Sequence, residues 1–312
     1  MSTSTELPKV NILLAVYNGE KHLKKQLDSL CAQTYENIDI YIRDDGSTDG
    51  SVSFVKKYID NNKSNKNIIF LEANNNLKCP GSFYEIAKKC NKAKYYAFCD
   101  QDDYWKPEKV QWAVEKLEEK ETDKPLVYFS ACEYITAEGE FIRKSPLQNE
   151  KTDLEDTLFY TPGSGFTIVF NEAARQKLIM EVEPGTELHD KWMIRGAVCL
   201  GDTIYDKRIT ASHIRHEVAV TAGDSDNLSL FLHFIKKELF GPEIKRDKQN
   251  LKYFYETFYN ELTEKEHKLF DLFTHDGFNF MNWLKKTFYP RRLRKRLSGE
   301  IVLRVLFLLG RI

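Results

Sequence analysis

The sequence predicts an α/β fold with a mainly parallel sheet, followed by a helical C-terminal region. Up to about residue 120, short apolar segments rich in β-prone residues alternate with segments of helical periodicity, which is the pattern of strands joined by crossover helices. Beyond about Thr221 such strands disappear, and aromatic-rich helical stretches replace them. With 312 residues, the chain is long enough for one large α/β domain and a smaller helical part.

The first strand is predicted at Val10–Val16, where VNILLAV runs into the turn Tyr17-Asn18-Gly19 before a helix at 20–33. Three further pairs of strand and helix follow in the same order, at 38–44 and 49–61, at 68–72 and 81–90, and at 94–100 and 107–120. Because ligands of parallel sheets collect at the carboxyl ends of the strands, the loops after Val16, Ile42 and Phe98 should converge on one crevice.

The pattern changes after Pro125 to the shorter apolar pieces PLVYFSA, EFIRK and GFTIVF. These pieces predict a mixed sheet that carries an acceptor subsite beside the nucleotide half. Helical stretches at 230–240 and 251–262 represent the C-terminal region. We expect a flexible N-terminus at 1–8, a catalytic domain at 9–220 and a helical region at 221–312.

The composition excludes several classes of protein. Lys and Arg number 46 against 47 Asp and Glu, so no global positive charge indicates nucleic-acid binding. The six cysteines form no CxxC pair and no zinc spacing, which is typical of reduced thiols in a cytosol. No signal-peptide pattern opens the chain and no apolar run is long enough to span a bilayer, so we expect a protein that is neither exported nor membrane-spanning.

An acidic cluster follows the fourth predicted strand, in the string FCDQDDYW. Asp100, Asp102 and Asp103 lie within four positions, and like charges this close repel unless a cation or hydrogen bonds offset them. Mg²⁺ and Mn²⁺ prefer such oxygen ligands and are commonly held by one or two carboxylates together with diphosphate oxygens. The cluster therefore predicts a divalent-cation site, and the alternative is a solvated acidic turn.

A second acidic turn, RDDGSTDG at 43–50, follows the second predicted strand. The Asp45 carboxylate could accept hydrogen bonds from a base N–H or a ribose hydroxyl, whereas Asp49 better suits the start of the following helix. In the first loop, AVYNGE, backbone groups and the Tyr17 ring could frame a base. Both loops are therefore candidates for nucleotide binding.

Together these strings resemble the family 2 glycosyltransferases with the GT-A fold, a nucleotide-diphospho-sugar transferase fold in which helices flank a Rossmann-like mixed sheet. The resemblance covers about residues 9 to 220: residues 10–49 look like the first two βα units of the family, and CDQDD looks like its DxD motif in the form DQDDxW. In detail the chain is most similar to bacterial rhamnosyltransferases that build cell-wall and O-antigen polysaccharides.

The resemblance implies roles for the residues of these motifs. Asp45 would contact the base of the donor, Asp100 the ribose or the metal, and Asp102 the Mn²⁺ or Mg²⁺ ion that bridges the two phosphates. The same strings supply further expected members of the site, namely Ala15, Tyr17 and Gln101 at the donor, and Asp103 and Trp105 toward the acceptor or behind the metal.

The string GTELHDKWMIRGA at 185–197 predicts a helix that opens with His189 and Asp190. Inverting transfer needs one base to take the proton of the acceptor hydroxyl while the anomeric carbon is attacked opposite the leaving diphosphate. HDxW resembles the rhamnosyltransferase form of the catalytic motif of the family, which makes Asp190 the expected general base and places His189 and Trp192 near the acceptor or behind the residues that contact it. From the residues alone, the alternative is that Asp190 only stabilises the helix start.

Two more segments are candidates for the acceptor and leaving-group sides. Gly163 and Ser164 would let a sugar approach the backbone closely, and their loop resembles the acceptor-facing loop of the family. His213, Arg215 and His216 follow one another at a predicted strand end, where Arg or His could neutralise the departing diphosphate or complete the metal shell. We assign His216 to the metal and Arg215 to its surroundings. The segment departs from the commoner YRxHxxN pattern, and a surface role stays open for His213.

The C-terminal string FYPRRLRKRLSGEIVLRVLFLLGRI joins a basic cluster to an apolar run that Arg304 interrupts. This combination suits anchoring at an anionic bilayer surface, which a polyprenyl-linked acceptor would make useful. Deletion from about Phe288 should then leave a folded enzyme, and the alternatives are a packed terminal helix or a homodimer contact. The basic cluster consists of Arg291, Arg292, Arg294, Lys295 and Arg296.

The expected function is sugar transfer with inversion, on the inner face of the plasma membrane, to a saccharide acceptor that a polyprenyl lipid carries. The resemblance favours dTDP-rhamnose as donor, while UDP-hexoses and UDP-N-acetylhexosamines stay open. A nucleotidyltransferase would want a basic, Gly-rich triphosphate loop near the N-terminus, and the sequence has none there. The remaining alternative is a non-catalytic scaffold that binds sugar nucleotides in a polysaccharide assembly complex.

Overall fold

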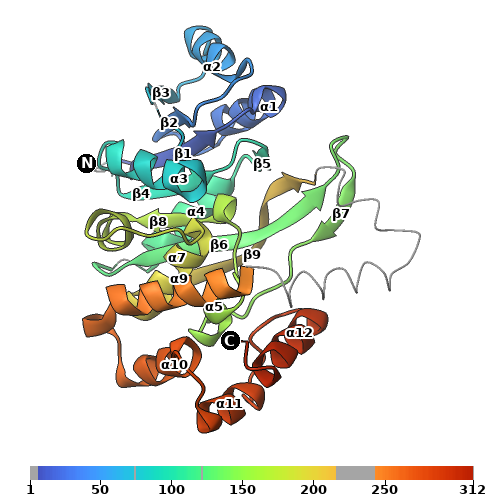
Figure 1. Ribbon diagram of the computed structural model, residues 1–312. Helices are drawn as coiled ribbons and strands as arrows, with labels where there is room; N and C mark the ends of the chain where they lie inside the picture. The colour runs from blue at the N-terminus through green and yellow to red at the C-terminus, as the bar shows by residue number, and fades with distance from the viewer. Residues whose placement is uncertain (1–5, 74, 121, 216–242, 312) are drawn as a thin grey trace.

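The computed structural model describes residues 6–73, 75–120, 122–215 and 243–311 (Figure 1). Within them lies one mixed sheet of nine strands: β1 Val10–Val16, β2 Ile38–Asp44, β3 Asn67–Leu71, β4 Tyr95–Cys99, β5 Asp103–Trp105, β6 Leu126–Ile135, β7 Phe141–Lys144, β8 Val169–Asn171 and β9 Asp202–Ile214. The strand order is β3-β2-β1-β4-β8-β6-β9-β5, and β7 pairs with β6. The predicted fold class, a mixed sheet flanked by helices with a helical C-terminal region, is confirmed.

Helices cover both faces of this sheet. Those before β9 are α1 Glu20–Cys31, α2 Ser51–Asp60, α3 Lys78–Lys89, α4 Lys109–Glu118, α5 Glu155–Leu158, α6 Glu172–Arg175 and α7 His189–Leu200, with the single turns η1 Gly165–Thr167 and η2 Gln176–Met180. The C-terminal helices are α9 Glu243–Thr257, α10 Glu264–Thr274, α11 Phe280–Thr287 and α12 Leu297–Leu308. Figure 1 shows α10, α11 and α12 at the end of the molecule opposite α1 and α2. The helix predicted at 230–240 lies outside the described residues.

The N-terminal half of the sheet is parallel, as the alternation predicted. β1 pairs in parallel with both β2 and β4, and β2 pairs in parallel with β3. The second half is mixed, because β8 runs antiparallel to β4 and β6 whereas β9 runs parallel to β6. β1 and β2 have the bounds predicted from the sequence, since continuous apolar runs are typical of parallel strands that are covered on both faces.

Two local features differ from the predictions. β5 was not predicted, because three residues are too short to show a period of two, and its pairing partner β9 lies about a hundred residues away. The string GFTIVF is not one strand: Gly165–Thr167 form a turn of 3₁₀ helix, and the strand follows only at Val169.

Alternating side chains of the strands supply two hydrophobic cores. Ile12 and Leu14 of β1 pack with α1, α2 and α4, whereas Leu13 between them belongs to the core on the other face. This second core continues from Phe98 of β4 through α7 and α9 to Leu303 of α12. The C-terminal helices α9, α10 and α12 therefore share one core with the sheet, whereas α11 contributes no side chain to it.

Helix α12 is packed into this core on one face. The Phe307 ring lies 5.7 Å from the rings of Phe159 and Phe273. Deletion from Phe288 would remove this face and uncover Phe159 and Phe273, so the packing argues against the expectation that the shortened chain stays folded. None of the described helices is long and apolar enough to cross a membrane. The side chains of α12 that are at most 3% exposed are Val302, Leu303, Leu306 and Phe307.

Candidate active site

The carboxyl ends of β1, β2 and β4 surround a pocket of about 170 Å³, and the start of α3 closes its side. It brings together six of the residues predicted for the donor and the metal, namely Ala15, Tyr17, Asp45, Asp100, Gln101 and Asp102. The remaining lining residues are Val16, Cys79, Ser82 and Phe83. The last three come from α3, and no motif in the sequence marked them.

Asp45 organises one wall of this pocket. Its carboxylate accepts hydrogen bonds from the backbone N–H groups of Leu77 at 2.8 Å and Lys78 at 2.6 Å, and it forms an ion pair with the buried Arg43. Arg43 in turn donates to the Ser82 hydroxyl at 2.9 Å. A carboxylate has about four acceptor positions, so Asp45 can hold the start of α3 against β2 and still accept from a ligand.

Gln101 links the acidic loop to the first loop. Its Oε1 accepts from the Tyr17 N–H at 2.8 Å, and its Nε2 donates to the Tyr17 carbonyl at 3.0 Å. A Cβ on Gly19 would lie 2.3 Å from Oε1, so only glycine leaves room for this contact. Gln101 therefore positions Tyr17, whose ring is 49% exposed, and since it also lines the pocket its predicted place at the donor stays a prediction.

The three carboxylates of the acidic loop lie at different depths. Asp100 and Asp102 are half-buried, whereas Asp103 is fully buried behind them. Burial and the neighbouring charges of Asp103 and Asp102 raise the pKa of Asp100 well above its usual range. Burial and the charge of Asp102 do the same to the pKa of Asp103. The crowded negative charge would be relieved by a cation.

The pairing of β5 with β9 brings His213 to these carboxylates. Asp103 and His213 are register partners, and His213 Nδ1 lies 2.6 Å from Asp103 Oδ1. The imidazole also stacks on the Phe166 ring at 5.5 Å. The sequence left a surface role open for His213, and only knowledge of β5 could have placed it here. Arg215 lies over the Tyr134 ring at 5.5 Å, and His216, predicted as a metal ligand, lies outside the described residues.

The donors at this cluster are carboxylate oxygens and one imidazole, a set that suits Mg²⁺ or Mn²⁺. The buried Asp103 Oδ2 has no hydrogen-bond partner, which fits a shell in which a cation offsets its charge. In the described parts of the chain, no three His, Cys, Asp or Glu side chains are arranged around one point as a complete metal site. A cation would therefore take Asp102 and Asp100 from the protein and its other ligands from a diphosphate and water, as Mg²⁺ commonly does.

Asp190 approaches the same pocket from the start of α7. Burial and the charges of Asp100, Asp190 and Asp45 raise the pKa of the Cys79 thiol to about 12. The ring of His189, which precedes Asp190, lies 4.3 Å from the ring of Phe83, so the start of α7 packs beside a residue that lines the pocket. Asp190 Oδ1 also accepts from the Lys191 N–H at 2.7 Å, as expected of a residue that stabilises a helix start. Burial nevertheless raises the pKa of Asp190 to about 6, so it outweighs the stabilisation of the carboxylate by this N–H and by the Lys191 charge.

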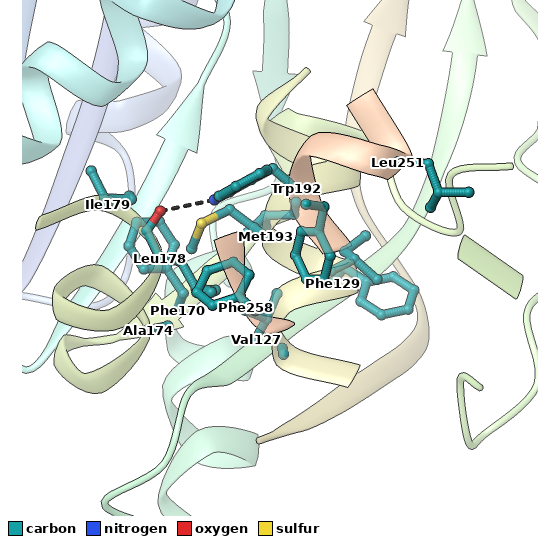
Figure 2. Close-up of a cluster of buried hydrophobic side chains, with 14 of the residues drawn as sticks. Val127, Phe129, Phe170, Ala174, Leu178, Ile179, Trp192, Met193, Leu251 and Phe258 are labelled. Atoms are coloured by element: carbon teal, nitrogen blue, oxygen red, sulfur yellow. Dashed lines mark hydrogen bonds between the residues drawn. The ribbon is translucent and has the colours of Figure 1, made fainter. Parts of the chain in front are cut away.

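Trp192 is a core residue, so of the two positions predicted for it the structure does not support direct contact with an acceptor. Its side chain is 0% exposed, and its Nε1 donates to the Leu178 carbonyl at 2.8 Å (Figure 2). The rings of Phe254 and Phe258 lie 5.2 and 5.7 Å from the indole ring. Trp192 therefore anchors α7 to α9 and η2 within the core.

His189 is also buried, at 5% exposure, so it does not reach an acceptor. Its ring lies 4.3 Å from that of Phe83 and 4.7 Å from that of Phe98, and neither ring nitrogen has a hydrogen-bond partner. Burial lowers its pKa to about 3, which keeps the imidazole neutral. A Cβ on Gly165 would lie 2.1 Å from His189 Nε2, so this glycine makes room for the ring.

Trp105 and Gly163, which were predicted either at the acceptor or behind the residues that contact it, belong to the interior. Trp105 is 4% exposed, and the Lys109 ammonium lies 4.4 Å from its ring centre. Gly163 is buried, and a Cβ there would lie 2.7 Å from the Phe129 ring, so the glycine accommodates a core side chain and not a sugar. Ser164 between the two packed glycines is half-buried and stays a candidate for the acceptor side.

We expect Trp192→Ala to lower the free energy of unfolding by about 3–5 kcal/mol, the usual cost of removing a large buried aromatic side chain. Urea unfolding followed by circular dichroism measures this change. Trp192→Phe keeps most of the volume and loses the hydrogen bond to Leu178, which should cost about 1 kcal/mol. A Trp192→Ala protein of unchanged stability but weaker acceptor binding would restore the acceptor role.

The mixed sheet flanked by helices, with carboxylates at the ends of its parallel strands, is the arrangement expected of a nucleotide-diphospho-sugar transferase fold. The chain belongs to glycosyl transferase family 2, whose family model matches residues 11–182. These residues contain β1 to β4, the acidic loop and the strand β8, but not Asp190.

Similar proteins carry glycosyltransferase names. The Escherichia coli protein UDP-Glc:alpha-D-GlcNAc-diphosphoundecaprenol beta-1,3-glucosyltransferase WfaP is 34% identical over 125 residues, which are 40% of this chain and 45% of that protein. An uncharacterized glycosyltransferase of Rickettsia typhi is 30% identical over 128 residues, which are 41% of this chain and 38% of that one. The chain thus matches less than half of the length of these relatives.

The fold is also similar to a solved structure, that of residues 1–349 of Staphylococcus aureus TarS. The similarity covers 97% of this chain and 82% of that one with a TM-score of 0.57 and 16% sequence identity. The same protein in complex with UDP-GlcNAc matches with a TM-score of 0.53, also at 16% identity, and there it covers 97% of this chain and 92% of that one. At this identity the similarity concerns the fold alone.

Proposed function

We propose that this chain is an inverting glycosyltransferase that moves a sugar from a nucleoside diphosphate to a hydroxyl of a saccharide or lipid-linked saccharide. The observation that carries the proposal is that Tyr17, Asp45, Asp100 and Asp102 line one pocket, and that α7 packs its first residue, His189, on the lining residue Phe83, which brings the adjacent Asp190 to this side of the sheet. The family supports the same reaction class. A protein that only bound a sugar nucleotide would not need a carboxylate with a pKa near 6, such as Asp190, beside the pocket.

The chemistry follows from the positions of the side chains. Tyr17, Asp45, Asp100 and Asp102 all line this pocket. We assign Tyr17 and Asp45 to the base of the donor, and Asp100 and Asp102 to its diphosphate. Mn²⁺ or Mg²⁺ held by these two carboxylates would supply positive charge to the departing diphosphate. Asp190, mostly ionised at pH 7, accepts the proton of the acceptor hydroxyl. The hydroxyl oxygen bonds to the anomeric carbon as the bond to the diphosphate oxygen breaks on the opposite face, which inverts the configuration.

Two donors are in competition. The string HDKW at 189–192 supports L-rhamnose from dTDP-rhamnose through its resemblance to rhamnosyltransferases. UDP-sugars have different support, because the name of the E. coli relative specifies UDP-Glc and a diphosphoundecaprenol acceptor, and the S. aureus protein was crystallised with UDP-GlcNAc. We favour dTDP-rhamnose as the donor and a polyprenyl-linked saccharide at the inner face of the plasma membrane as the acceptor.

A panel of dTDP-rhamnose, UDP-glucose and UDP-N-acetylglucosamine tests the proposal. Each donor is incubated with the protein and a saccharide acceptor in the presence of Mn²⁺, Mg²⁺ or EDTA, and released nucleotide and product are measured. We expect one donor to be consumed in a cation-dependent way, with the anomeric configuration inverted in the product by NMR. Retained configuration would overturn the mechanism, and nucleotide binding without any turnover would favour a non-catalytic scaffold.

A further inference from the structure

The C-terminal helices form a second pocket, of about 270 Å³, far from the site described above. The loop after α10 supplies His275 and Phe278, α11 supplies Trp283 and Lys286, and the chain end supplies Arg311. Lys248 of α9 completes the wall. We call this the basic pocket. Figure 1 places these helices at one end of the molecule, which leaves this face free of the sheet.

Positive charge dominates the basic pocket. Burial and the charge of Lys248 lower the pKa of Lys286 to about 8, whereas the attraction of Asp276 acts in the opposite direction. Asp276 is shared, because it lies 3.5 Å from the Lys248 ammonium and 2.5 Å from that of Lys252. The Asp276 carboxylate is the first negative charge near Lys248 and Lys286, the two lysines that line the pocket. A bound phosphate would add a second one, so the charge of the pocket is complementary to that of a phosphate.

Apolar side chains surround the same pocket and point away from the core. Phe278 is 77% exposed, and Phe280 and Met281 are both more than half exposed. Trp283 joins these groups, because its ring stacks on Phe280 at 5.7 Å and its Nε1 donates to the Leu308 carbonyl of α12 at 3.0 Å. Aromatic rings beside cationic groups are typical of the boundary between lipid headgroups and acyl chains.

The exposed apolar surface continues along α12. Its buried face packs on the core, whereas the opposite face exposes a stripe at helical spacing. Contiguous apolar surface of this kind marks an interaction site on a soluble surface. The stripe consists of Leu297, Ile301, Val305, Leu308 and Leu309.

The basic string predicted from the sequence does not supply all of its charges to such a surface. Arg291 forms ion pairs with Asp153 and Asp156 at 2.8 and 2.7 Å, and Arg304 donates to Glu300 at 2.7 Å. These two arginines therefore fix the helical region internally. Arg292 and Arg296 of the basic string are exposed, and the basic pocket adds Lys248, Lys286 and Arg311 to the charge of this region.

We propose that the basic pocket binds the phosphate of an anionic lipid headgroup in a bilayer, while Phe278, Phe280, Met281 and the exposed stripe of α12 enter the boundary with the acyl chains. The occupant is a lipid surface because cationic groups and exposed apolar groups share one face, and a soluble anion would use only the cationic groups. This docking is independent of the proposed sugar transfer, since it involves none of the residues at the strand ends.

Vesicle flotation of the full-length protein tests this assignment. We expect binding to vesicles of equal parts phosphatidylcholine and phosphatidylglycerol, and at least about tenfold weaker binding to phosphatidylcholine alone, since two or three cations near an anionic surface contribute this much. Phe278→Ser combined with Met281→Ser, and separately Arg311→Glu, should each weaken binding about tenfold. All three positions are exposed, so these variants should fold. The matched controls are Phe141→Ser on β7, 59% exposed, and Lys268→Glu on α10, which should bind as the unaltered protein does.

Three results would overturn the assignment. One is equal binding to both kinds of vesicle or to neither. Another is inorganic phosphate that protects the protein against thermal unfolding while anionic vesicles do not, which would make the pocket a site for a free anion. The third is a protein that is a dimer in solution, and in which Phe278→Ser combined with Met281→Ser dissociates the dimer but does not change vesicle binding. Because flotation measures no turnover, its failure and the failure of the proposed transfer reaction are separate outcomes.

Discussion

Asp190→Asn should lower kcat by about two to four orders of magnitude and leave donor affinity nearly unchanged, because loss of a general base has this range of effect. The amide keeps the shape of the side chain and can still accept from the Lys191 N–H, so α7 should start at the same place. It cannot take a proton from the acceptor hydroxyl. Initial rates with a soluble acceptor measure kcat, and calorimetric titration with the donor nucleotide measures affinity.

The pH dependence of this residue provides an independent measurement. Burial raises the pKa of Asp190 to about 6, so kcat of the unaltered protein should fall about tenfold for each pH unit below 6, and this limb should be missing in Asp190→Asn. The folded state holds a proton that the unfolded state, with its ordinary aspartate pKa near 3.8, has already released. The stability that Asp190 contributes is therefore lost as the pH rises through 6, and Asp190→Asn should have an equal or higher Tm at pH 8.

An unchanged kcat in Asp190→Asn would contradict the assignment, as would a rate limb near pH 6 that survives the substitution. Lys191→Gln is a useful control, because it removes a neighbouring charge and leaves the carboxylate in place. Its rate limb should move upward in pH and its maximum rate should stay close to that of the unaltered protein, since the Lys191 charge lowers the pKa of Asp190.

The strands and the donor pocket could be predicted because their signals are local. Apolar runs such as Val10–Val16 end at turns that carry Tyr17, Asp45 and Asp100, and parallel pairing then brings the ends of those strands together. His213 could not be placed in this way. Its position depends on a strand of three residues that pairs across a separation of about a hundred residues, and no periodicity indicates such a strand.

The roles of the residues in the HDKW string could not be predicted for a different reason, which is the geometry of the helix. Successive residues of an α-helix are turned by about 100°, so Asp190 and Trp192 point in nearly opposite directions. Only Asp190 approaches the pocket, while Trp192 packs under Phe254. A motif at the start of a helix can therefore contain one residue that takes part in the reaction and others that only pack the helix against the core. The sequence alone does not show which residue has which role.

The C-terminal helix was ambiguous because it is apolar on both faces. Leu303 and Phe307 meet the core, whereas Ile301 and Val305 are exposed, and both pairs have helical spacing. Which pair is buried depends on the partner surface that Phe159 and Phe273 provide. Long-range packing of this kind is outside what a local pattern determines.

Asp102→Ala should weaken cation-dependent binding of the donor nucleotide by at least about tenfold, because an interaction with a charged group contributes about 1.5–3 kcal/mol. The diphosphate would lose the ion that neutralises it, while the base contacts of Asp45 and Tyr17 would stay. Calorimetric titrations with the nucleoside diphosphate in Mn²⁺ and in EDTA measure the effect. Asp60→Ala, an exposed carboxylate at the end of α2, is the control and should bind as the unaltered protein does.

The same substitution should have the opposite effect on stability when no cation is present. The Asp102 charge repels both Asp100 and Asp103, so its removal should raise Tm in EDTA. In Mn²⁺ the unaltered protein should gain stability by binding the ion and the Asp102→Ala protein should gain less, because a ligand that binds only the folded state raises Tm. Two melting curves for each protein, one in EDTA and one in Mn²⁺, distinguish these signs. If the acidic loop holds no cation, Asp102→Ala should still raise Tm in EDTA, but Mn²⁺ should then change the Tm of neither protein. A nucleotide affinity that does not depend on metal and is unchanged in Asp102→Ala would show that the metal has no part in the mechanism.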